Sequence, residues 1–346
     1  DQQQWNRGFV ARGTVTMSDV AELAGVSKMT VSNVVNDRPG VSGEVRERVL
    51  KAIRKSGYRL NVSARTLKSG RTGVIGLAVP EVDRPYFGLL AAQVIAEADR
   101  RGFHVAVEQT GAAIAGELDA IAQSHRLQFD GLILSAVGFD PRTWRLPSGD
   151  LPLVMLGEQD LGMSIDHVMM PNEEGTEAAT GHLVEAGCRK IAIVTGASGD
   201  EDTNASSRRY KGYLSALERH GLTPDPALRV TAPGWDLEGG RAAGHRLAEA
   251  GAAVDGVVAV TDTVAQGVLR GLADKGVRVP DQVRLIGFDD IPEAAYMTPS
   301  LSTVAPDHQW MAAKAVELVA ARIADPDREA TQHTAPYAIM ARETTR

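Results

Sequence analysis

The chain has little of what several large classes of protein require. It holds a single cysteine, Cys188, among 346 residues, which excludes an internal disulfide and a cluster of cysteine metal ligands. No apolar run approaches the roughly 20 residues that a membrane span needs, and no signal peptide is visible at the N-terminus. We therefore expect a cytoplasmic protein with no membrane partner.

Motifs that carry cofactor or catalytic chemistry are also missing. The sequence has no G-x-G-x-x-G after a predicted strand, no Walker loop and no G-x-S-x-G elbow. Its histidines show no metal-binding spacing. Asp289 and Asp290 offer two acidic groups, but nothing supplies a partner for acid–base catalysis. These absences predict a protein that is not an enzyme and holds no metal or cofactor.

Length and charge indicate a small basic part attached to a large acidic one. At 346 residues the chain is long enough for two or three domains, and its 43% apolar share is that of a globular protein. Residues 14–72 hold 11 Lys/Arg and 5 Asp/Glu, whereas residues 73–346 hold 24 Lys/Arg and 38 Asp/Glu. A basic N-terminal part suits a domain that binds DNA.

Two short helical patterns flank Gly25. Each has three apolar residues at helical spacing, Val20, Leu23 and Ala24 in the first pattern and Val31, Val34 and Val35 in the second. Ser18 and Ser27 are placed as N-caps of these helices, and Gly25 suits the tight turn between them. Helices this short must pack on each other and on a third helix.

The outward face of the second pattern carries hydrogen-bonding groups and one apolar side chain. Its residues are Lys28, Met29, Ser32, Asn33 and Asn36. Such side chains read base edges in a major groove, so the pattern predicts a helix-turn-helix whose second helix is the DNA reader. The alternative is an ordinary helical hairpin with a solvated polar face.

The flanking segments complete this head. Residues 1–13 show no periodicity, and we expect a disordered tail there. A third helix is capped by Ser42 and stopped by Gly57. Its apolar stripe is Val45, Val49 and Ile53. Its basic residues, among them Arg48, either contact phosphate or are solvated.

Residues 61–72 are expected to form a hinge. A helix of about two turns is marginal in water, so we expect it to form only on DNA. Leu67 is a large apolar side chain flanked by Arg65 and Lys68, and it would wedge between two bases from the minor groove. The alternative is a plain linker leucine.

Beyond the hinge, short apolar runs alternate with amphipathic helical stretches. The runs lie at 74–79, 104–107, 131–134, 153–156, 191–194, 256–260 and 284–288. This alternation predicts parallel sheets covered by helices on both faces. The expected fold class is therefore an all-α head plus an α/β body, with two subdomains because about 270 residues are too many for one sheet.

The predicted strand ends suggest a ligand site, because such sheets bind ligands beyond the carboxyl ends of their strands. These ends carry small, polar or acidic residues, among them Ser135, Glu158, Thr261, Asp262 and Asp289. Trp235 lies in a loop beside carboxylates, an arrangement that offers an apolar face and acceptors to a polyhydroxyl ligand. The alternative is that Trp235 anchors the following helix.

Two long stretches of the N-terminal part carry a recognisable pattern, TMSDVAELAGVSKMTVSNVVN and VSGEVRERVLKAIRKSGYRLNVSARTLKSGRTGVIGLAVP. Shorter pieces follow in the body: FDGLIL, GHLVEAGCRKIAIVTG, RYKGYLSAL, DTVAQGVLRGL, VRLIGFDD and PSLSTV. With these motifs the chain resembles, from about Val15 to the C-terminus, bacterial transcription repressors of the lactose/galactose-repressor (LacI/GalR) family. The first two stretches match the family's head, hinge and first strand almost throughout.

The resemblance implies a helix-turn-helix domain at 14–60, a hinge at 61–72 and an effector-binding, dimerising body at 73–346 similar to type I periplasmic binding proteins. The N-subdomain would take 73–172 and 305–332, and the C-subdomain 173–304 and 333–346. No heptad tail follows the last strand, which favours a homodimer over a tetramer. A dimer presents two reader helices to a palindromic operator.

The resemblance also assigns DNA contacts. Lys28 and Met29 are expected to contact bases, with Thr30 and Ser32 on phosphate or base edges. The DNA-binding set further includes Ser27, Asn36, Arg65, Leu67 and Lys68. The family's usual T-V-S-R-V has Asn33 in place of arginine here. Since arginine reads guanine and asparagine pairs best with adenine, we expect an altered operator base at that position.

For the cleft, the resemblance implies roles residue by residue. Arg209 matches the arginine of R-x-x-G-[FY], which holds ligand hydroxyl or carboxylate groups. Asp289 matches the ligand-binding aspartate of G-[FY]-D-D, and Trp235 matches an aromatic that stacks on the ligand. The loop after the first strand matches through Asp83, Tyr86 and Phe87, with Arg84 replacing the usual asparagine. Thr261 stands where many members have asparagine before Asp262.

We therefore expect a repressor whose operator affinity is set by a small molecule, with a coupling of ~1–3 kcal/mol. The aspartates, Arg209 and Trp235 favour a sugar or related polyol over a nucleobase or another metabolite. Release of DNA by the sugar is favoured over co-repression. A cytoplasmic sugar-binding module without regulatory DNA binding stays open as an alternative; an enzyme would need a catalytic constellation that the sequence lacks.

Overall fold

The computed structural model describes residues 15–35, 39–58, 71–137, 151–157, 165–196, 204–249 and 254–346. The chain divides into two compact units, a head of residues 1–72 and a body of residues 73–346. The expectations for the 1–13 tail, for most of the hinge and for Asn36, Arg65, Leu67, Lys68 and Glu158 lie outside the described residues.

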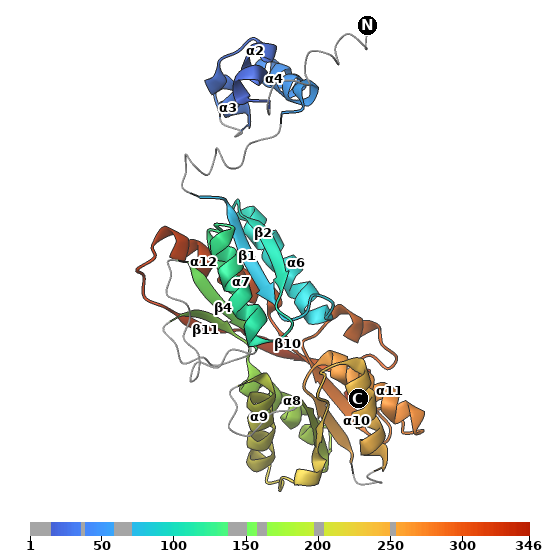
Figure 1. Ribbon diagram of the computed structural model, residues 1–346. Helices are drawn as coiled ribbons and strands as arrows, with labels where there is room; N and C mark the ends of the chain where they lie inside the picture. The colour runs from blue at the N-terminus through green and yellow to red at the C-terminus, as the bar shows by residue number, and fades with distance from the viewer. Residues whose placement is uncertain are drawn as a thin grey trace. The chain divides into compact units, whose positions relative to one another are not determined.

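Three helices form the described part of the head (Figure 1). They are α2 (Met17–Ala24), α3 (Lys28–Val35) and α4 (Gly43–Ser56). Ser27 caps α3, since its hydroxyl accepts from Thr30 N at 3.1 Å. Ser42 caps α4 in the same way, accepting from Val45 N at 3.4 Å. Gly25 ends α2 with a φ of 64°, a left-handed conformation that suits glycine.

The N-cap of α2 is Thr16, and the expectation that Ser18 would cap this helix is wrong. The Thr16 hydroxyl accepts from Asp19 N at 3.4 Å, and the Asp19 carboxylate accepts from Thr16 N at 2.8 Å. This reciprocal capping box satisfies two N–H groups at the helix start. Ser18 consequently lies inside the first turn.

The head core is small and apolar. It consists of Val20, Ala21, Ala24, Val31, Val34, Val49 and Ala52. Leu23 was expected on the inner face of α2, but its side chain is 44% exposed and Ala21 is buried instead. Helices this short depend on mutual packing for their stability, so this cluster holds the three together.

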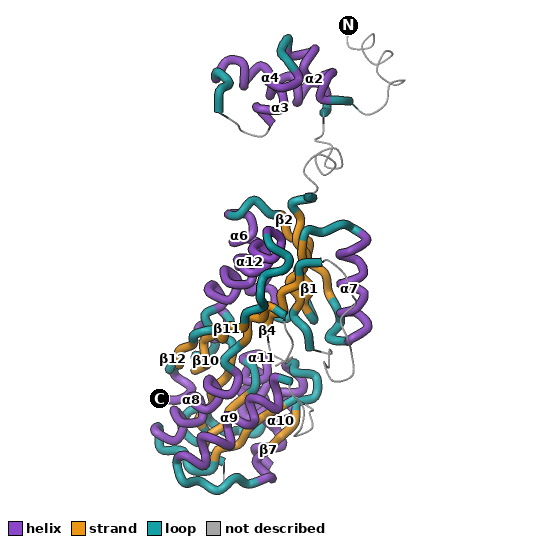
Figure 2. The backbone as a smooth tube through the Cα atoms, turned by 90° about the vertical axis from the view of Figure 1, so that its left-hand side faces the viewer, coloured by secondary structure: helices purple, strands orange, loops and turns teal. Residues whose placement is uncertain are grey.

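A six-stranded parallel sheet forms the centre of the N-subdomain, in the order β11-β5-β4-β3-β1-β2. Its strands are β1 (Val74–Val79), β2 (His104–Gln109), β3 (Gly131–Leu134), β4 (Leu153–Gly157), β5 (Asp166–Met169) and β11 (Gln332–Thr334). Helices α6 (Pro85–Arg100) and α12 (His308–Ala324) pack together on one face, and α7 (Ile114–Arg126) covers the other (Figure 2).

The C-subdomain repeats this plan with the strand order β12-β10-β9-β8-β6-β7. Its strands are β6 (Ile191–Thr195), β7 (Arg229–Thr231), β8 (Gly256–Ala259), β9 (Arg284–Phe288), β10 (Ser302–Pro306) and β12 (Tyr337–Met340). Only β12 among these described strands runs antiparallel to its neighbour. Helices α8 (Asn172–Glu185) and α9 (Ala205–Arg219) form one pair, and α10 (Leu237–Glu249) and α11 (Asp262–Asp274) form the other.

Helices α10 and α11 approach until their backbones touch. A Cβ on Gly244 would lie 2.6 Å from the Val268 carbonyl oxygen, and a Cβ on Gly271 would lie 2.2 Å from the Arg241 carbonyl oxygen. Both distances are too short for any side chain, so glycine at these positions sets the spacing of the two helices. In the described part of the chain, no helix has the length and apolar character to cross a membrane.

The chain passes between the subdomains after β5, after β10 and after β11. The expected boundaries need correction by one or two residues at each crossing. Asn172 already begins α8 of the C-subdomain. Ala305 and Pro306 pair with β12, so they belong to the C-subdomain sheet. His333 and Thr334 pair with β5 and belong to the N-subdomain sheet. The subdomain to which these residues belong is decided by strand pairing, and strands this short carry no sequence pattern that predicts their pairing.

Five strands were absent from the expected runs, namely β5, β7, β10, β11 and β12. Of these, β7, β11 and β12 lie at sheet edges. Edge strands are short and partly solvated, so they lack the continuous apolar run that marks a central strand.

Candidate effector cleft and DNA-reading surface

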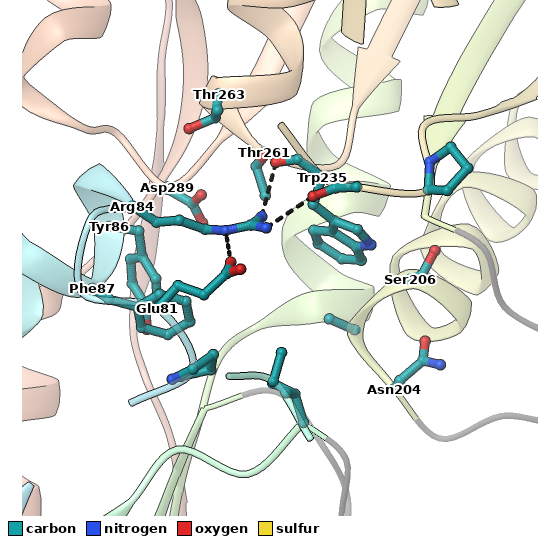
Figure 3. Close-up of a pocket in the computed structure, with 16 residues that line it drawn as sticks. Glu81, Arg84, Tyr86, Phe87, Asn204, Ser206, Trp235, Thr261, Thr263 and Asp289 are labelled. Atoms are coloured by element: carbon teal, nitrogen blue, oxygen red, sulfur yellow. Dashed lines mark hydrogen bonds and ion pairs between the residues drawn. The ribbon is translucent and has the colours of Figure 1, made fainter. Parts of the chain in front are cut away.

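A cleft of about 360 Å³ opens in the body, and described residues from both subdomains line it (Figure 3). The N-subdomain contributes the end of β1 and the first turn of α6. The C-subdomain contributes the loops before α9 and α10 and the residues that follow β8 and β9. The carboxyl ends of parallel strands therefore meet at this cleft, where α/β folds bind their ligands.

Three aromatic side chains give the cleft apolar surfaces. Tyr86 and Phe87 lie at the start of α6, with their ring centroids 4.8 Å apart. Trp235 belongs to the C-subdomain and lies between β7 and α10 (Figure 3). Its φ of 54° is unusual for a side-chain-bearing residue and turns the loop tightly before α10. The cleft thus presents aromatic surfaces from both of its walls.

Asp289 brings a carboxylate into the cleft from the end of β9. Its backbone carbonyl accepts a hydrogen bond from His308 Nε2, and its Oδ1 lies 3.9 Å from Arg209 Nη2. Burial lowers the pKa of His308, which favours the neutral ring. Because the Asp289 carbonyl can only accept, the proton of the neutral ring is on Nε2. Because His308 belongs to α12 of the N-subdomain, Asp289 is positioned by groups from both subdomains.

Hydroxyl and amide groups complete the polar lining. Thr261 Oγ1 accepts from Val264 N at 3.1 Å and Asn204 Oδ1 accepts from Ser207 N at 3.1 Å, so each caps the helix that follows it. These bonds fix both side chains and use acceptor atoms, which leaves the hydroxyl and amide hydrogens as donors. A ligand that carries several hydroxyl groups can use such donors beside the Asp289 acceptor.

Half of the expected effector residues lie in this lining, namely Tyr86, Phe87, Trp235, Thr261 and Asp289. Asp83 is exposed and lies outside the lining. Ser135, Arg209 and Asp262 are buried and are not among the lining residues. The structure therefore gathers the aromatic part of the expected site with Thr261 and Asp289, and leaves Ser135, Arg209 and Asp262 outside the lining.

Arg209 is fully buried and engaged by protein groups. Its Nε donates to Asn172 Oδ1 at 2.9 Å, and its Nη1 donates to the Val260 carbonyl. Its guanidinium carbon lies 3.7 Å from the centroid of the Phe288 ring, a cation–π contact. These partners come from the start of α8 and the ends of β8 and β9. Arg209 therefore connects α8, α9 and the two strands beneath Asp289.

Asp262 is also fully buried. Its carboxylate accepts from Thr303 Oγ1 at 2.6 Å and from Ile291 N at 2.9 Å. Burial raises the pKa of Asp262 to about 8 despite these two hydrogen bonds. The side chain connects α11 to the segments that follow β9 and form β10, which is a structural role beside the cleft.

Several lining residues were not in the expected set: Glu81, Arg84, Asn204, Ser206 and Thr263. Glu81 and Arg84 lie in the loop after the first strand, where contacts with the effector were expected, and Thr263 follows directly after Thr261 and Asp262. The sequence thus contained a signal for these three. Asn204 is the N-cap of α9 and Ser206 lies in its first turn, and neither had such a signal, because polar residues at a helix start serve as ordinary caps everywhere.

The residues of the reader helix α3 that were expected to contact DNA differ in their exposure to solvent. Lys28 and Met29 are exposed, and Met29 is 74% exposed, which is high for an apolar side chain. Ser32 and Asn33 are partly buried on the same helix. Thr30 Oγ1 lies 2.8 Å from Ser27 Oγ, so these two hydroxyls form a hydrogen bond at the start of the helix.

Arg48 of α4 reaches back to the first helix. Its Nε donates to the Ala24 carbonyl at 3.0 Å, at the C-terminal end of α2. A cation there satisfies an unpaired carbonyl and suits the negative end of the helix dipole. Arg48 therefore holds the helix-turn-helix on α4, and contact of its exposed side chain with phosphate stays a prediction.

Comparison with known proteins agrees with this architecture. Bacterial regulatory proteins of the lacI family match residues 16–61, and the periplasmic binding protein-like domain matches residues 180–345. The ribose operon repressor of Halalkalibacterium halodurans is 30% identical over 331 residues, which cover 96% of this chain and 97% of that protein. The chain belongs to the LacI family.

Solved structures show the same fold. A LacI-family transcriptional regulator from Sanguibacter keddieii is 40% identical, with a TM-score of 0.73 over 80% of this chain and 99% of its own. The transcriptional regulator CelR in complex with cellobiose is 28% identical, with a TM-score of 0.71 over 95% of this chain and 99% of its own. This LacI-family protein is therefore a DNA-binding regulator of transcription and not an enzyme.

Proposed function

We propose that this protein represses transcription from a palindromic operator and that a sugar bound in the cleft controls its affinity for DNA. The cleft carries the proposal, because it sets Trp235 of one subdomain and Tyr86 of the other around the buried carboxylate of Asp289. Sugars combine apolar C–H faces, which pack on aromatic rings, with hydroxyl groups that bind carboxylates.

Two relatives support a sugar as the class of effector. One is named a ribose operon repressor, and the other was solved with cellobiose. The position of the cleft between two subdomains supports control of DNA binding, since a ligand that contacts both walls favours one arrangement over the other. We expect a coupling that changes operator affinity roughly 5–150-fold.

Titration with a panel of mono- and disaccharides tests the effector class. Tryptophan fluorescence of the full chain should change in a saturable way with one sugar, and calorimetry should give the same affinity. Trp235→Phe should lose the fluorescence response and weaken binding. Trp310→Phe should keep both, because Trp310 lies in α12 and outside the lining. No response to any sugar from a folded protein would reject a sugar effector.

We propose that the head binds DNA and that the protein is a homodimer, in which each subunit supplies one head. Lys28 and Met29 would contact bases, and Leu67 would insert at the operator centre. An operator selected from a randomised palindromic library should bind with steep salt dependence, about −0.9 in log–log slope per phosphate contact. Met29→Ala should lower specific affinity, whereas Lys211→Ala on the exposed surface of α9 should not. Salt-insensitive binding would instead support a sugar-binding module without regulatory DNA contacts.

A nucleobase is the second candidate effector. The aromatic rings from both walls favour it, since a flat base can stack on them. The same titration with adenine, guanine and hypoxanthine separates the two classes. The sign of control follows from the operator affinity measured with and without the active ligand. Loss of DNA binding identifies an inducer and gain identifies a co-repressor.

A further inference from the structure

Arg84 joins the two walls of the cleft through protein groups alone. It immediately precedes α6 in the N-subdomain, and its guanidinium extends toward the loop that carries Trp235 (Figure 3). Its Nη1 donates to the Trp235 carbonyl at 3.0 Å, and its Nη2 donates to the Gly234 carbonyl at 2.8 Å. Both acceptors belong to the C-subdomain, so these hydrogen bonds cross the cleft.

The guanidinium is oriented by a neighbour on its own wall. Glu81 Oε2 forms an ion pair with Arg84 Nε, which leaves the two terminal nitrogens directed at the carbonyls. This arrangement uses the planar, forked donor set of arginine. A shorter asparagine, the residue usual in this loop of the motif, could not span the same groups. Arg84 is also the single positive charge among the described residues that line the cleft.

The acceptor loop is fixed by a tight turn. Trp235 N donates to the Ala232 carbonyl at 3.1 Å, and Trp235 has a φ of 54°. Because this turn sets the direction of the Gly234 and Trp235 carbonyls, a group bonded to both carbonyls also sets the position of the indole. The bond to Arg84 therefore positions the aromatic wall and not only the loop.

We propose that Arg84 is a positioning residue that closes the cleft and holds Trp235 in place without an effector. It connects both walls, as a bound ligand does in a site between two lobes. The Arg84 and Glu81 side chains are 29% and 32% exposed, so water competes for the contact and the closure is reversible. The resting protein is then already largely closed, and effector entry requires these bonds to break.

The distance between the two subdomains tests this proposal directly. Spin labels at Asp119→Cys in α7 and Glu218→Cys in α9 sit on exposed positions of different subdomains. Cys188 is 1% exposed and should remain unlabelled. In the full chain with no sugar and no DNA, we expect a single short distance distribution. Arg84→Ala should shift it to longer and broader distances, and Arg84→Lys should do the same, because one ammonium cannot serve both carbonyls and Glu81.

Controls separate closure from folding. Arg84 makes no side-chain cap bond to α6, so its removal should leave the helix start intact. Arg126→Ala, which removes an exposed arginine of α7 outside the cleft, should keep the wild-type distance. Should Arg84→Ala misfold by circular dichroism, Arg84→Met retains the aliphatic stem and tests the same bonds. Unchanged distances in folded Arg84 variants would overturn the proposal. Since neither sugar nor DNA is present, the result does not depend on the proposed effector class.

Discussion

The indole of Trp235 lies against the backbone of Gly196. A Cβ on Gly196 would lie 1.9 Å from Trp235 Nε1, a distance that no side chain can accept. The glycine follows β6, and the tryptophan follows β7, the neighbouring strand of the same sheet. The aromatic wall of the cleft is thus held by Gly196 behind the ring and by Arg84 at the backbone.

Gly196→Ala should displace the Trp235 ring and weaken effector binding. The expected loss is roughly 2–12-fold in affinity, because an aromatic contact of about 0.5–1.5 kcal/mol is removed. The sugar that wild type binds, titrated by calorimetry, measures the change. Gly88→Ala is the matched control, since a Cβ there meets only the Val82 carbonyl oxygen at 3.9 Å. Wild-type affinity in Gly196→Ala would show that the indole does not contact the ligand.

The contact between α10 and α11 should not tolerate a methyl group. Gly244→Ala and Gly271→Ala each place a Cβ within 2.6 Å of a backbone oxygen of the partner helix, so the helices must separate. We expect a loss of about 1–3 kcal/mol or more in the free energy of unfolding, measured in urea. Gly181→Ala, whose Cβ would lie 3.4 Å from His220 Nε2, should change stability little or raise it. Equal effects at all three positions would contradict this explanation.

Asp262 should make stability fall as the pH rises. Burial raises its folded-state pKa to about 8, whereas an unfolded aspartate titrates near 4. Between these values the folded state binds a proton that the unfolded state has lost, so folding weakens by up to about 1.4 kcal/mol per pH unit. The slope appears from about pH 4 and ends near pH 8.

Asp262→Asn removes this titration and is sterically close to the protonated acid. Its amide oxygen can accept from Ile291 N, and its NH₂ can donate to Thr303 Oγ1, whose hydroxyl can turn to the Val304 carbonyl at 3.2 Å. The free energy of unfolding of wild type and of Asp262→Asn is measured in urea at pH 5, 6, 7 and 8. In the difference between the two proteins, the contributions of all other titrating groups cancel. A difference that is constant with pH would show that Asp262 is ionised throughout.

Asn33 on the reader helix should set one base of the operator. Asn33→Arg is expected to move the preference at one position of each half-site from adenine toward guanine, with ~1–3 kcal/mol of discrimination. Sequencing of operators selected by each protein from a randomised half-site library measures this. Leu23→Ala, at an exposed position of α2, serves as the control. An unchanged base preference in Asn33→Arg would remove Asn33 from the base-contacting set.

The sequence predicted the elements of the head more completely than the side chains that line the cleft of the body. In the head, helical spacing and caps predicted the three helices, because short-range patterns determine where a short helix starts and which side is apolar. One error is local: the capping box of Thr16 and Asp19, three positions apart, begins α2, and Ser18 lies inside its first turn. The hydrogen bond between Arg48 and the end of α2 joins residues 24 positions apart, and no local pattern predicts it.

In the cleft, the sequence predicted which segments meet but not which side chains face the space between them. Strand ends and motif matches identified Trp235, Asp289 and the start of α6. They could not distinguish Asp289, which lines the cleft, from Asp262, which is buried nearby, since both follow an apolar strand. Rotamer and packing, not residue type, separate them.

The sequence by itself determined the fold class, the order of the domains and the family, because these follow from periodicity and from motifs that are local in the chain. The tertiary structure decided the contacts between distant segments. It alone joined Arg84 to the Trp235 loop, 151 positions along the chain, and placed the indole on Gly196. Such contacts depend on how two sheets and their crossings are arranged in space, and no local pattern records that arrangement.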